Sequence, residues 1–452
     1  MQSLFVRWSR PYAIEPLVTF RILFGALMSF GALRFMYEGW IEKLYVEPRF
    51  FFKFYGFHWV EVWSETGMYA LYCVVAVSAF LVMLGCFYRL SILVFFLSFT
   101  YSELADATNY LNHYYLVCIL AFLLIFLPAH RAFSIDAWRK PAWKVSHVPA
   151  WCIYVLMLQI GIVYFYAGFA KLNTDWIFRA MPMAIWLPTK TDFPLIGSWF
   201  SKRWIAFAFS WAGAVYDLTI TFFLLYRPTR PLAYLGVVVF HLMTKLLFNI
   251  GLFPFIMIFN TLIFFSPQFH QRLLGYLGYR PLAKQVVWSP TFTITSFMQR
   301  SFGIRLVRGT LIVHFLFQFL FPLRHYGYAG NVLWTEEGYR FSWRVMLVEK
   351  AGQTTFYIED QATGQQSEVT NADYLTAFQE KQMSIQPDFI LQFARHIAQD
   401  YQMRYGFQAP KVTVDSHVAL NGRTSLQFID PKVNLLEVQD NWMPKYWVLK
   451  HR

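Results

Sequence analysis

The residue most able to do chemistry in this sequence is a lysine at the end of a long apolar run. Lys171 follows residues 151–170, which carry no charge, in the stretch "YFYAGFAKLNTDW". Desolvation at a membrane border disfavours the ammonium form, and a neutral amine can act as a general base. The alternative is a snorkelling lysine, whose stem lies along a helix while its amine reaches water. Spacing alone leaves both interpretations open.

Four further polar residues also lie within or beside apolar runs. Asn112 and His113 open one such run in "NYLNHYYL", where they either cap a helix in an interfacial belt or hydrogen-bond a ligand oxygen. His241 lies inside "VVVFHLMTKLLFNIGLFPF", and Asp217 lies inside "AVYDLTITF". An ionisable residue within a membrane segment is a functional hypothesis by default. For Asp217, a structural pair with a buried Lys, Arg or His and a catalytic role remain equal alternatives.

The composition indicates that membrane helices position these residues. Of the 452 residues, 57% are hydrophobic and only 14% are charged, whereas soluble domains average about 25% charged residues. We predict nine candidate membrane segments, because a crossing needs about 20 apolar residues. They are residues 17–36, 66–88, 90–102, 111–128, 151–170, 204–226, 231–247, 250–266 and 306–323.

The charges between these segments predict the orientation of the chain. The chain holds 39 Lys and Arg and 26 Asp and Glu; residues 324–452 hold 13 and 14, which leaves 26 and 12 in the first 323. The basic residues gather in alternate loops, whereas the loop after the first segment is acidic. By the positive-inside rule the N-terminus is cytoplasmic, and after nine crossings the C-terminal part is outside. This distribution favours membrane topology over nucleic-acid binding.

The last 129 residues have a different pattern. Three stretches, "FSWRVMLVEK", "TTFYIED" and "KVTVDSHVAL", are typical of strands, whereas "NADYLTAFQEKQ" and "PDFILQFARHIAQDYQMRY" have helical spacing. We therefore predict a polytopic α-helical membrane protein with a C-terminal α+β, β-rich extramembrane domain. The expected division is a transmembrane domain over residues 1–323 and an outer domain over residues 324–452.

Common enzyme signatures are absent from the sequence. It contains no P-loop, no dinucleotide-binding glycine pattern after a strand, no HExxH and no zinc-like Cys and His spacing. The four cysteines lie in or beside apolar runs and are interpreted as small buried residues, so no metal site is expected. A transporter would be expected to show repeated halves with paired broken helices, and none is visible.

An ordered set of motifs resembles the vitamin K-dependent γ-glutamyl carboxylases and their bacterial relatives. "GIVYFYAGFAKLNTDW" is similar to the family segment "IVYFIAG-x-K-K-L-D-A-D-W". Further matches are "TFRILFGALM", "VMLGCFYR", "NHYYL", "FHLMTKLLFNIGLFPF" and "FPLRHYGYAGNVLWTEEGYRFSWRVML". The resemblance runs from about residue 17 to about residue 400.

The resemblance implies a reaction and its participants. Reduced vitamin K, the hydroquinone, would react with O2 to form a strong base that removes a γ-proton from peptide-bound glutamate. CO2 would then add to the carbanion while the quinone leaves as its epoxide. No metal or nucleic acid is implied. The partners would be the bilayer, a glutamate-containing protein or peptide and, as a functional partner, a vitamin K or quinone reductase.

The resemblance also implies roles for residues. Lys171 aligns with the family's catalytic base, and Asn112 and His113 align with its Asn-His pair, which holds the quinone oxygens and stabilises developing charge. His241 would line the same cofactor cavity. The implied region for the glutamate substrate contains Trp334, Tyr339, Trp343 and Met346.

The sequence departs from the family pattern at several points. Ala170 replaces the first lysine of the pair, Asn173 replaces the following aspartate, and Thr244 replaces an asparagine. The outer part is shorter than in animal members, and no cysteine follows Cys152, so the family's lumenal disulfide is not expected. These features suggest a bacterial inner-membrane protein with a periplasmic C-terminal domain. They leave two alternatives open: a quinol epoxidase that no longer carboxylates, or a non-enzymatic quinone- or peptide-binding protein.

Overall fold

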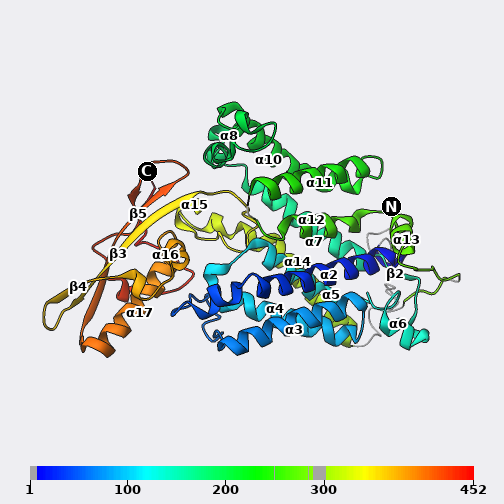
Figure 1. The fold of residues 1–452 in the computed structure, drawn as a ribbon, viewed down its shortest axis with the longest axis horizontal. Helices are drawn as coiled ribbons and strands as arrows, with labels where there is room; N and C mark the ends of the chain where they lie inside the picture. The colour runs from blue at the N-terminus through cyan, green and yellow to red at the C-terminus, as the bar shows by residue number, and fades with distance from the viewer. Residues whose placement is uncertain (1–7, 249, 284, 289–301, 452) are drawn as a thin grey trace.

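A computed structural model describes residues 8–248, 250–283, 285–288 and 302–451; the side chains of residues 302–305 are outside the description. Helices make up most of this part of the chain, and an antiparallel sheet with two helices lies at one end of the long axis (Figure 1). The helices before the sheet are α2 (Glu15–Tyr37), α3 (Glu65–Leu84), α4 (Tyr88–Ala105), α5 (Asn112–Phe126), α6 (Ile135–Arg139), α7 (Trp151–Ala170), α8 (Thr174–Arg179), α9 (Met183–Trp186), α10 (Arg203–Leu225), α11 (Arg230–Leu247), α12 (Phe253–Thr261), α13 (Pro267–Gly275), α14 (Phe302–Leu320) and α15 (Val332–Thr335).

All nine predicted membrane segments coincide with helices, but a count of nine crossings is not confirmed. Within the described residues, six helices are long and apolar enough to cross a membrane: Glu15–Tyr37, Glu65–Leu84, Trp151–Ala170, Arg203–Leu225, Arg230–Leu247 and Leu306–Gly327. The α5 helix and the segment Phe253–Phe264 are apolar but shorter, and α4 is not among the six. The chain is therefore an integral membrane protein with six candidate spans among its described residues.

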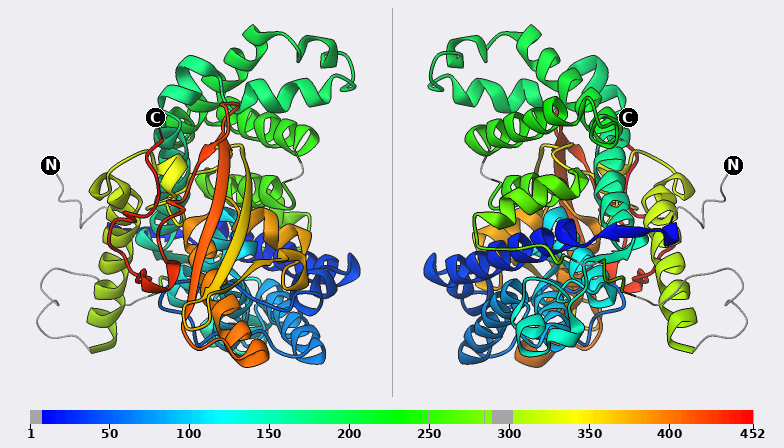
Figure 2. Two further views of the ribbon diagram at one scale, coloured as in Figure 1. Left: turned by 90° about the vertical axis from the view of Figure 1, so that its left-hand side faces the viewer. Right: turned by 90° about the vertical axis from the view of Figure 1, so that its right-hand side faces the viewer.

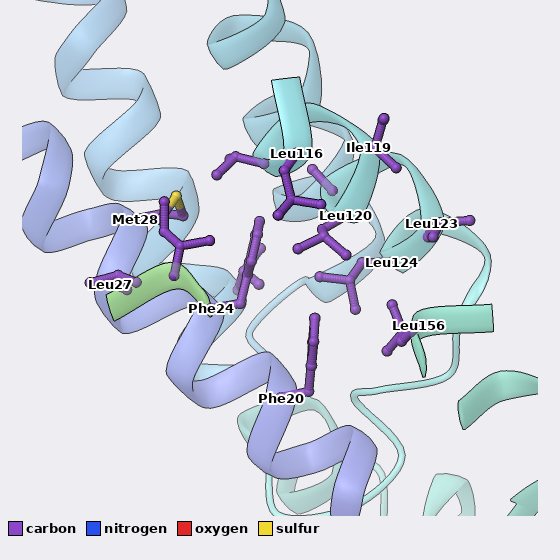
Figure 3. Packing of buried hydrophobic residues seen from close by; sticks show 14 of the residues in the cluster. Phe20, Phe24, Leu27, Met28, Leu116, Ile119, Leu120, Leu123, Leu124 and Leu156 are labelled. Atoms are coloured by element: carbon purple, nitrogen blue, oxygen red, sulfur yellow. The ribbon is translucent and has the colours of Figure 1, made fainter. Parts of the chain in front are cut away.

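The helices pack on one another through a continuous apolar core. Figure 3 shows the part in which α2 meets α5 and α7: Phe20 and Phe24 of α2 face Leu120 and Leu124 of α5. All four of these side chains are buried. Because α5 is held along its length in this way, its first residues, Asn112 and His113, have a fixed position at the end nearest the sheet.

The predicted C-terminal β-containing region is confirmed. Its strands are β3 (Lys350–Asp360), β4 (Gln365–Val369), β5 (Pro410–Leu420) and β6 (Leu426–Gln427), in the order β4–β3–β5–β6. Its helices are α16 (Ala377–Met383) and α17 (Pro387–Tyr405). A short ribbon of β1 (Pro11–Ala13) and β2 (His147–Pro149) lies apart from this sheet, near the other end of the molecule.

The sheet buries one face against α17. In β3 and β5 alternate residues are buried, as expected for a sheet with one covered face. The register pairs Phe356 with Val414 and Ile358 with Val412, and all four side chains are buried with Phe393 of α17. Figure 2 shows the long β3 and β5 strands side by side, with α17 against them.

One predicted strand is wrong. The stretch "FSWRVMLVEK" forms a strand only from its last residue, Lys350, where β3 begins. Phe341, Trp343 and Met346 instead have φ values of 60°, 57° and 54°, which lie in the left-handed region that a strand never uses. The stretch is apolar because it packs among the helices, and Trp343 belongs to the same core cluster as the α2–α5 contact.

Candidate active site

Lys171 is buried and forms an ion pair with Asp217. Its Nζ lies 2.7 Å from Oδ2 of Asp217 and 3.2 Å from the carbonyl oxygen of Ala167. The side chains of the pair retain only 6% and 8% of their exposure, so the amine does not reach bulk water. The ring of Trp176 lies 5.2 Å from Nζ and covers the amine. Snorkelling, the alternative that the sequence left open for Lys171, is therefore not what the structure shows.

Close approach of two helices makes this pair possible. Lys171 follows the last residue of α7, and Asp217 lies in the middle of α10. A Cβ on Gly168 would lie 2.6 Å from the backbone nitrogen of Leu218, and one on Gly161 would lie 3.0 Å from Thr221 Cγ2. Glycine at these two positions, seven residues apart on one helix face, lets the backbones of α7 and α10 meet at the level of Asp217.

The ion pair lines a small apolar cavity of about 100 Å³. Tyr164 and Lys171 are seven residues apart, which places them on the same face of α7, toward the cavity. The α11 helix contributes Phe240, His241 and Thr244, whereas α12 contributes Phe253 and Met257. The remaining wall is mainly apolar: Val163, Ala167, Trp176, Met183, Phe209, Gly213, Met243, Leu247, Phe248, Val345 and Met346.

His241 lines the same cavity and has one ring nitrogen without a hydrogen-bond partner among the described residues. Its Nε2 lies 3.1 Å from the hydroxyl of Tyr164, while its Nδ1 is buried without a hydrogen-bond partner among the described residues. Buried polar atoms are almost always hydrogen-bonded, so an orphaned ring nitrogen at a cavity wall is a group that a ligand would satisfy.

Asn112 and His113 line a second, larger cavity of about 850 Å³. This cavity shares Phe253, Val345 and Met346 with the lysine cavity. The ring of Phe253 lies between the two histidines, with its centroid 5.6 Å from that of His113 and 5.6 Å from that of His241. The structure thus brings Lys171 and His241 together and places Asn112 and His113 behind a thin apolar partition.

The partition consists of Phe253 of α12 together with Val345 and Met346 of the irregular segment over residues 341–346. Asn112 donates from Nδ2 to the carbonyl oxygen of Arg344 at 3.0 Å, and Tyr110 donates to Oδ1 of Asn112 at 3.0 Å. The backbone N–H of Phe341 donates to the Tyr110 hydroxyl at 2.8 Å. These contacts hold a strained backbone in place; left-handed non-glycine residues cost about 1–2 kcal/mol each and gather where a site needs them.

The four residues predicted for the peptide substrate have different environments. Met346 lies at the wall of both cavities. Trp334 is buried in the C-terminal domain, where its Nε1 donates to the carbonyl oxygen of Leu449 at 2.7 Å. Trp343 is buried against Tyr115, and Tyr339 packs beside the core of the C-terminal domain. In the described part of the chain, Met346 alone of the four lines these cavities.

The residues that follow Lys171 fasten the site to the C-terminal domain. Asn173 caps α8 by accepting from the backbone N–H of Trp176, and Trp176 Nε1 donates to the carbonyl oxygen of Ser210 at 2.6 Å. Asp175 accepts from Asn421 Nδ2 at 2.9 Å and from both terminal nitrogens of Arg423, one at 2.7 Å. Burial alone would raise the pKa of Asp175, but these hydrogen bonds hold it below its ordinary value.

Several of these residues escaped the sequence analysis. It left the partner of Asp217 open, and it gave no role to Asp175, Tyr164 or Phe253. Tyr164 could have been found from its spacing of seven residues before Lys171, which puts both on one helix face. The pairing of Asp217 and the docking of Asp175 join residues 46 and 248 positions apart in the chain. No local sequence pattern predicts contacts between residues so far apart in the chain.

The arrangement combines the requirements for proton transfer away from water. The amine is the potential base, the carboxylate is its partner, and the orphaned imidazole nitrogen can orient a hydroxyl or oxygen. Fold and site together define an integral membrane protein with a buried polar pair in an apolar cavity.

Family comparisons agree with this class. Residues 9–269 match the family model of the HTTM domain, and residues 304–452 match that of the vitamin K-dependent gamma-carboxylase lumenal domain. The chain therefore belongs to the vitamin K-dependent γ-carboxylase family. No solved structure matches it. The family domains indicate a carboxylase-type function that uses reduced vitamin K and a glutamate-containing substrate.

Proposed function

We propose that this protein is a vitamin K-dependent γ-glutamyl carboxylase, a peptidyl-glutamate 4-carboxylase that couples epoxidation of reduced vitamin K by O2 to carboxylation by CO2. The observation that carries the proposal is the buried Lys171–Asp217 pair in an apolar cavity, in a chain that matches both domains of this family. A lysine enclosed in this way is suited to proton abstraction and unsuited to an exposed structural role.

The groups around the cavity fit reduced vitamin K. A fused-ring hydroquinone has an apolar body and two hydroxyl groups, and the cavity offers aromatic and aliphatic walls with Lys171 Nζ and the unpartnered His241 Nδ1. When bound, reduced vitamin K supplies, through its oxidation by O2, a base strong enough to remove the γ-proton of glutamate. The residues that would hold it are Lys171 and His241, with Asn112 and His113 across the partition.

Each of these residues has a distinct task in the proposal. Lys171 accepts a hydroxyl proton at Nζ, and the resulting ammonium stabilises the negative charge that develops beside it. His241 orients an oxygen through Nδ1. Asn112 uses one N–H and its oxygen within the protein, so its second N–H is the group that it offers to the cofactor. The apolar walls exclude water, which would otherwise quench a strong base.

Cavity size implies that the partition moves. Sites for small organic ligands are about 300–1,000 Å³, whereas the lysine cavity has about 100 Å³ and its neighbour about 850 Å³. We infer that a fused ring enters by displacing Phe253 or Met346, which stand between the two spaces. The same movement would bring His113 to the cofactor.

The proposal also includes the domain limits, the membrane orientation and a partner enzyme. We assign residues 1–323 to the transmembrane domain and residues 324–452 to an outer domain that presents peptide-bound glutamate, with Met346 nearest the cavity and Trp334, Tyr339 and Trp343 in support. An N-terminus in the cytoplasm and a periplasmic outer domain in a bacterial inner membrane agree with the basic segments around α6 and α13, which lie at the end opposite the sheet (Figure 1). A quinone reductase would return the cofactor to its reduced form.

The proposal is tested with the purified protein in detergent, reduced vitamin K, O2, labelled bicarbonate and a short glutamate-containing peptide. Epoxide and incorporated label are measured together for the wild type, Lys171→Ala and a control, Lys202→Ala, which removes an exposed lysine before α10. The wild type and control are expected to form both products and Lys171→Ala neither. Epoxide without label would favour the epoxidase alternative. No epoxide from folded wild type would refute the proposed function.

A further inference from the structure

The partner of Lys171 is a carboxylate that has no other described hydrogen bond. Asp217 lies on α10 with 8% of its side chain exposed, and the 2.7 Å contact from Lys171 Nζ to its Oδ2 is the hydrogen bond that it makes within the described residues. The other titratable groups near the pair are Tyr164 of α7 and His241 of α11, which line the same cavity, and Tyr216 of α10, which interacts with Asp217 and packs against Tyr164 and His241. From α12 and the 345–346 segment only apolar side chains face it, among them Phe253 and Met346.

A buried acid next to a buried amine has two forms with the same net charge. In the ionic form the ammonium faces the carboxylate, and in the neutral form the proton lies on Asp217 while Lys171 is a free amine. Burial in apolar surroundings penalises both charges of the ionic form. A short hydrogen bond of 2.7 Å allows the proton to pass between the two atoms without any change in the charge of the cavity.

We propose that Asp217 is a positioning residue that holds the proton of Lys171, so that the lysine is available as a neutral base at physiological pH. The inference rests on the proposed function, because it assigns the route by which the base of that same site becomes free. It also gives a reason for the close α7–α10 approach at Gly168, since that approach sets the distance between the amine and the carboxylate.

The proton transfers balance. An N–H bond of the Lys171 ammonium breaks as an O–H bond forms at Asp217, which leaves an amine and a carboxylic acid. The amine then takes one proton from a hydroxyl of the bound quinol, and the site holds an ammonium, a neutral acid and one anion. Net charge stays at zero in each step. The proton on Asp217 returns toward solvent when product leaves, which restores the ionic pair.

The functional test compares Asp217→Asn, Asp217→Glu and the wild type for epoxide formation across pH. Asp217→Asn keeps the volume but cannot take a proton. We expect it to lower kcat by about 100-fold near neutral pH and to move the rising limb of the pH profile to higher pH, where the lysine loses its proton unaided. Asp217→Glu is expected to recover part of the rate and to return the rising limb of the pH profile to its wild-type position. A structural role alone would lower the yield of folded protein and leave the profile unchanged.

A second measurement does not depend on catalytic activity. Infrared difference spectra of the wild type, with and without quinol under argon, are recorded with unlabelled and with 13C-labelled aspartate. A protonated-carboxyl band that moves with the label is expected on quinol binding, and it should be absent from Lys171→Ala. No such band, or an Asp217→Asn enzyme with the wild-type rate and pH profile, overturns the proposal. Wild type that forms no epoxide instead refutes the proposed function, so the two failures are distinct.

Discussion

The contacts of Asp175 with Asn421 and Arg423, which we call the Asp175 clamp, allow a quantitative prediction about the stability of the fold. Asp175→Asn keeps the size of the side chain but removes the charge that accepts from Asn421 and from both terminal nitrogens of Arg423. Breaking a buried charge pair costs about 3–5 kcal/mol. Arg423 retains 24% of its exposure, so water compensates it in part, and we expect a loss of about 2–3 kcal/mol.

The effect should depend on pH in a defined direction. The pKa of Asp175 is lower in the folded protein than its ordinary value of about 3.9. Stabilisation by the carboxylate is therefore complete above about pH 4 and is lost as the pH falls through the folded pKa. The wild type should lose its advantage over Asp175→Asn only at pH values below about 4.

The assay is thermal unfolding in detergent at a series of pH values, for the wild type, Asp175→Asn and a matched control, Asp192→Asn. Asp192 is an exposed acid in the loop that precedes α10, so its loss should leave stability within about 0.5 kcal/mol of the wild type. Equal stability of Asp175→Asn and the wild type at pH 7, or a difference that persists unchanged at pH 3, would refute the reasoning about the clamp.

Further predictions address the cavities and the core. Burial raises the pKa of Asp106 to about 6 despite hydrogen bonds from Thr108 and Gln379. The wild type should therefore lose stability as the pH rises from about 4 to about 6, with the full penalty of up to about 3 kcal/mol above about pH 6. In unfolding experiments Asp106→Asn should show this gain over the wild type at pH 7 and little of it at pH 4, and a pH-independent difference would contradict this. Met346→Ala should change the ratio of kcat/KM for fused-ring and single-ring quinols by about tenfold, or about 1.4 kcal/mol, and an unchanged ratio would show that the partition does not limit entry. His241→Phe should lower kcat/KM for the quinol by about tenfold through loss of Nδ1. A wild-type kcat/KM would show that Nδ1 does not contact the quinol. Trp334→Phe should cost about 2 kcal/mol of stability with an unchanged peptide KM, because Trp334 is buried in the C-terminal core; a raised KM in folded protein would instead support direct contact.

The sequence was sufficient for the elements whose pattern is local and long. The uncharged run over residues 151–170 coincides with α7, and the helical spacing of residues 387–405 coincides with α17. The first is a continuous apolar run that ends at Lys171, and the second has a helical period and begins at Pro387. In each, one feature of composition dictates both the type of the element and its limits.

The arrangement of the site could not be predicted in the same way. Lys171 and Asp217 meet because Gly161 and Gly168 bring two helices together, and the effect of a glycine on helix contact depends on which face the partner covers. The segment over residues 341–349 has the apolar, β-branched composition of a strand, yet it lies among helices where its left-handed residues are held by Tyr110 and Asn112. Tertiary contacts override the local preference at such a place.

Chemical rescue of Lys171→Ala tests most directly whether the amine of Lys171 is the base. The variant is supplied with small primary amines that fit the space left by the side chain, and epoxide formation is measured against amine concentration and pH, with Lys202→Ala and the wild type alongside. If Lys171 acts as a neutral amine, rescue should rise with the concentration of unprotonated amine and be absent in the controls. Full activity of Lys171→Ala without added amine would show that another group takes the proton.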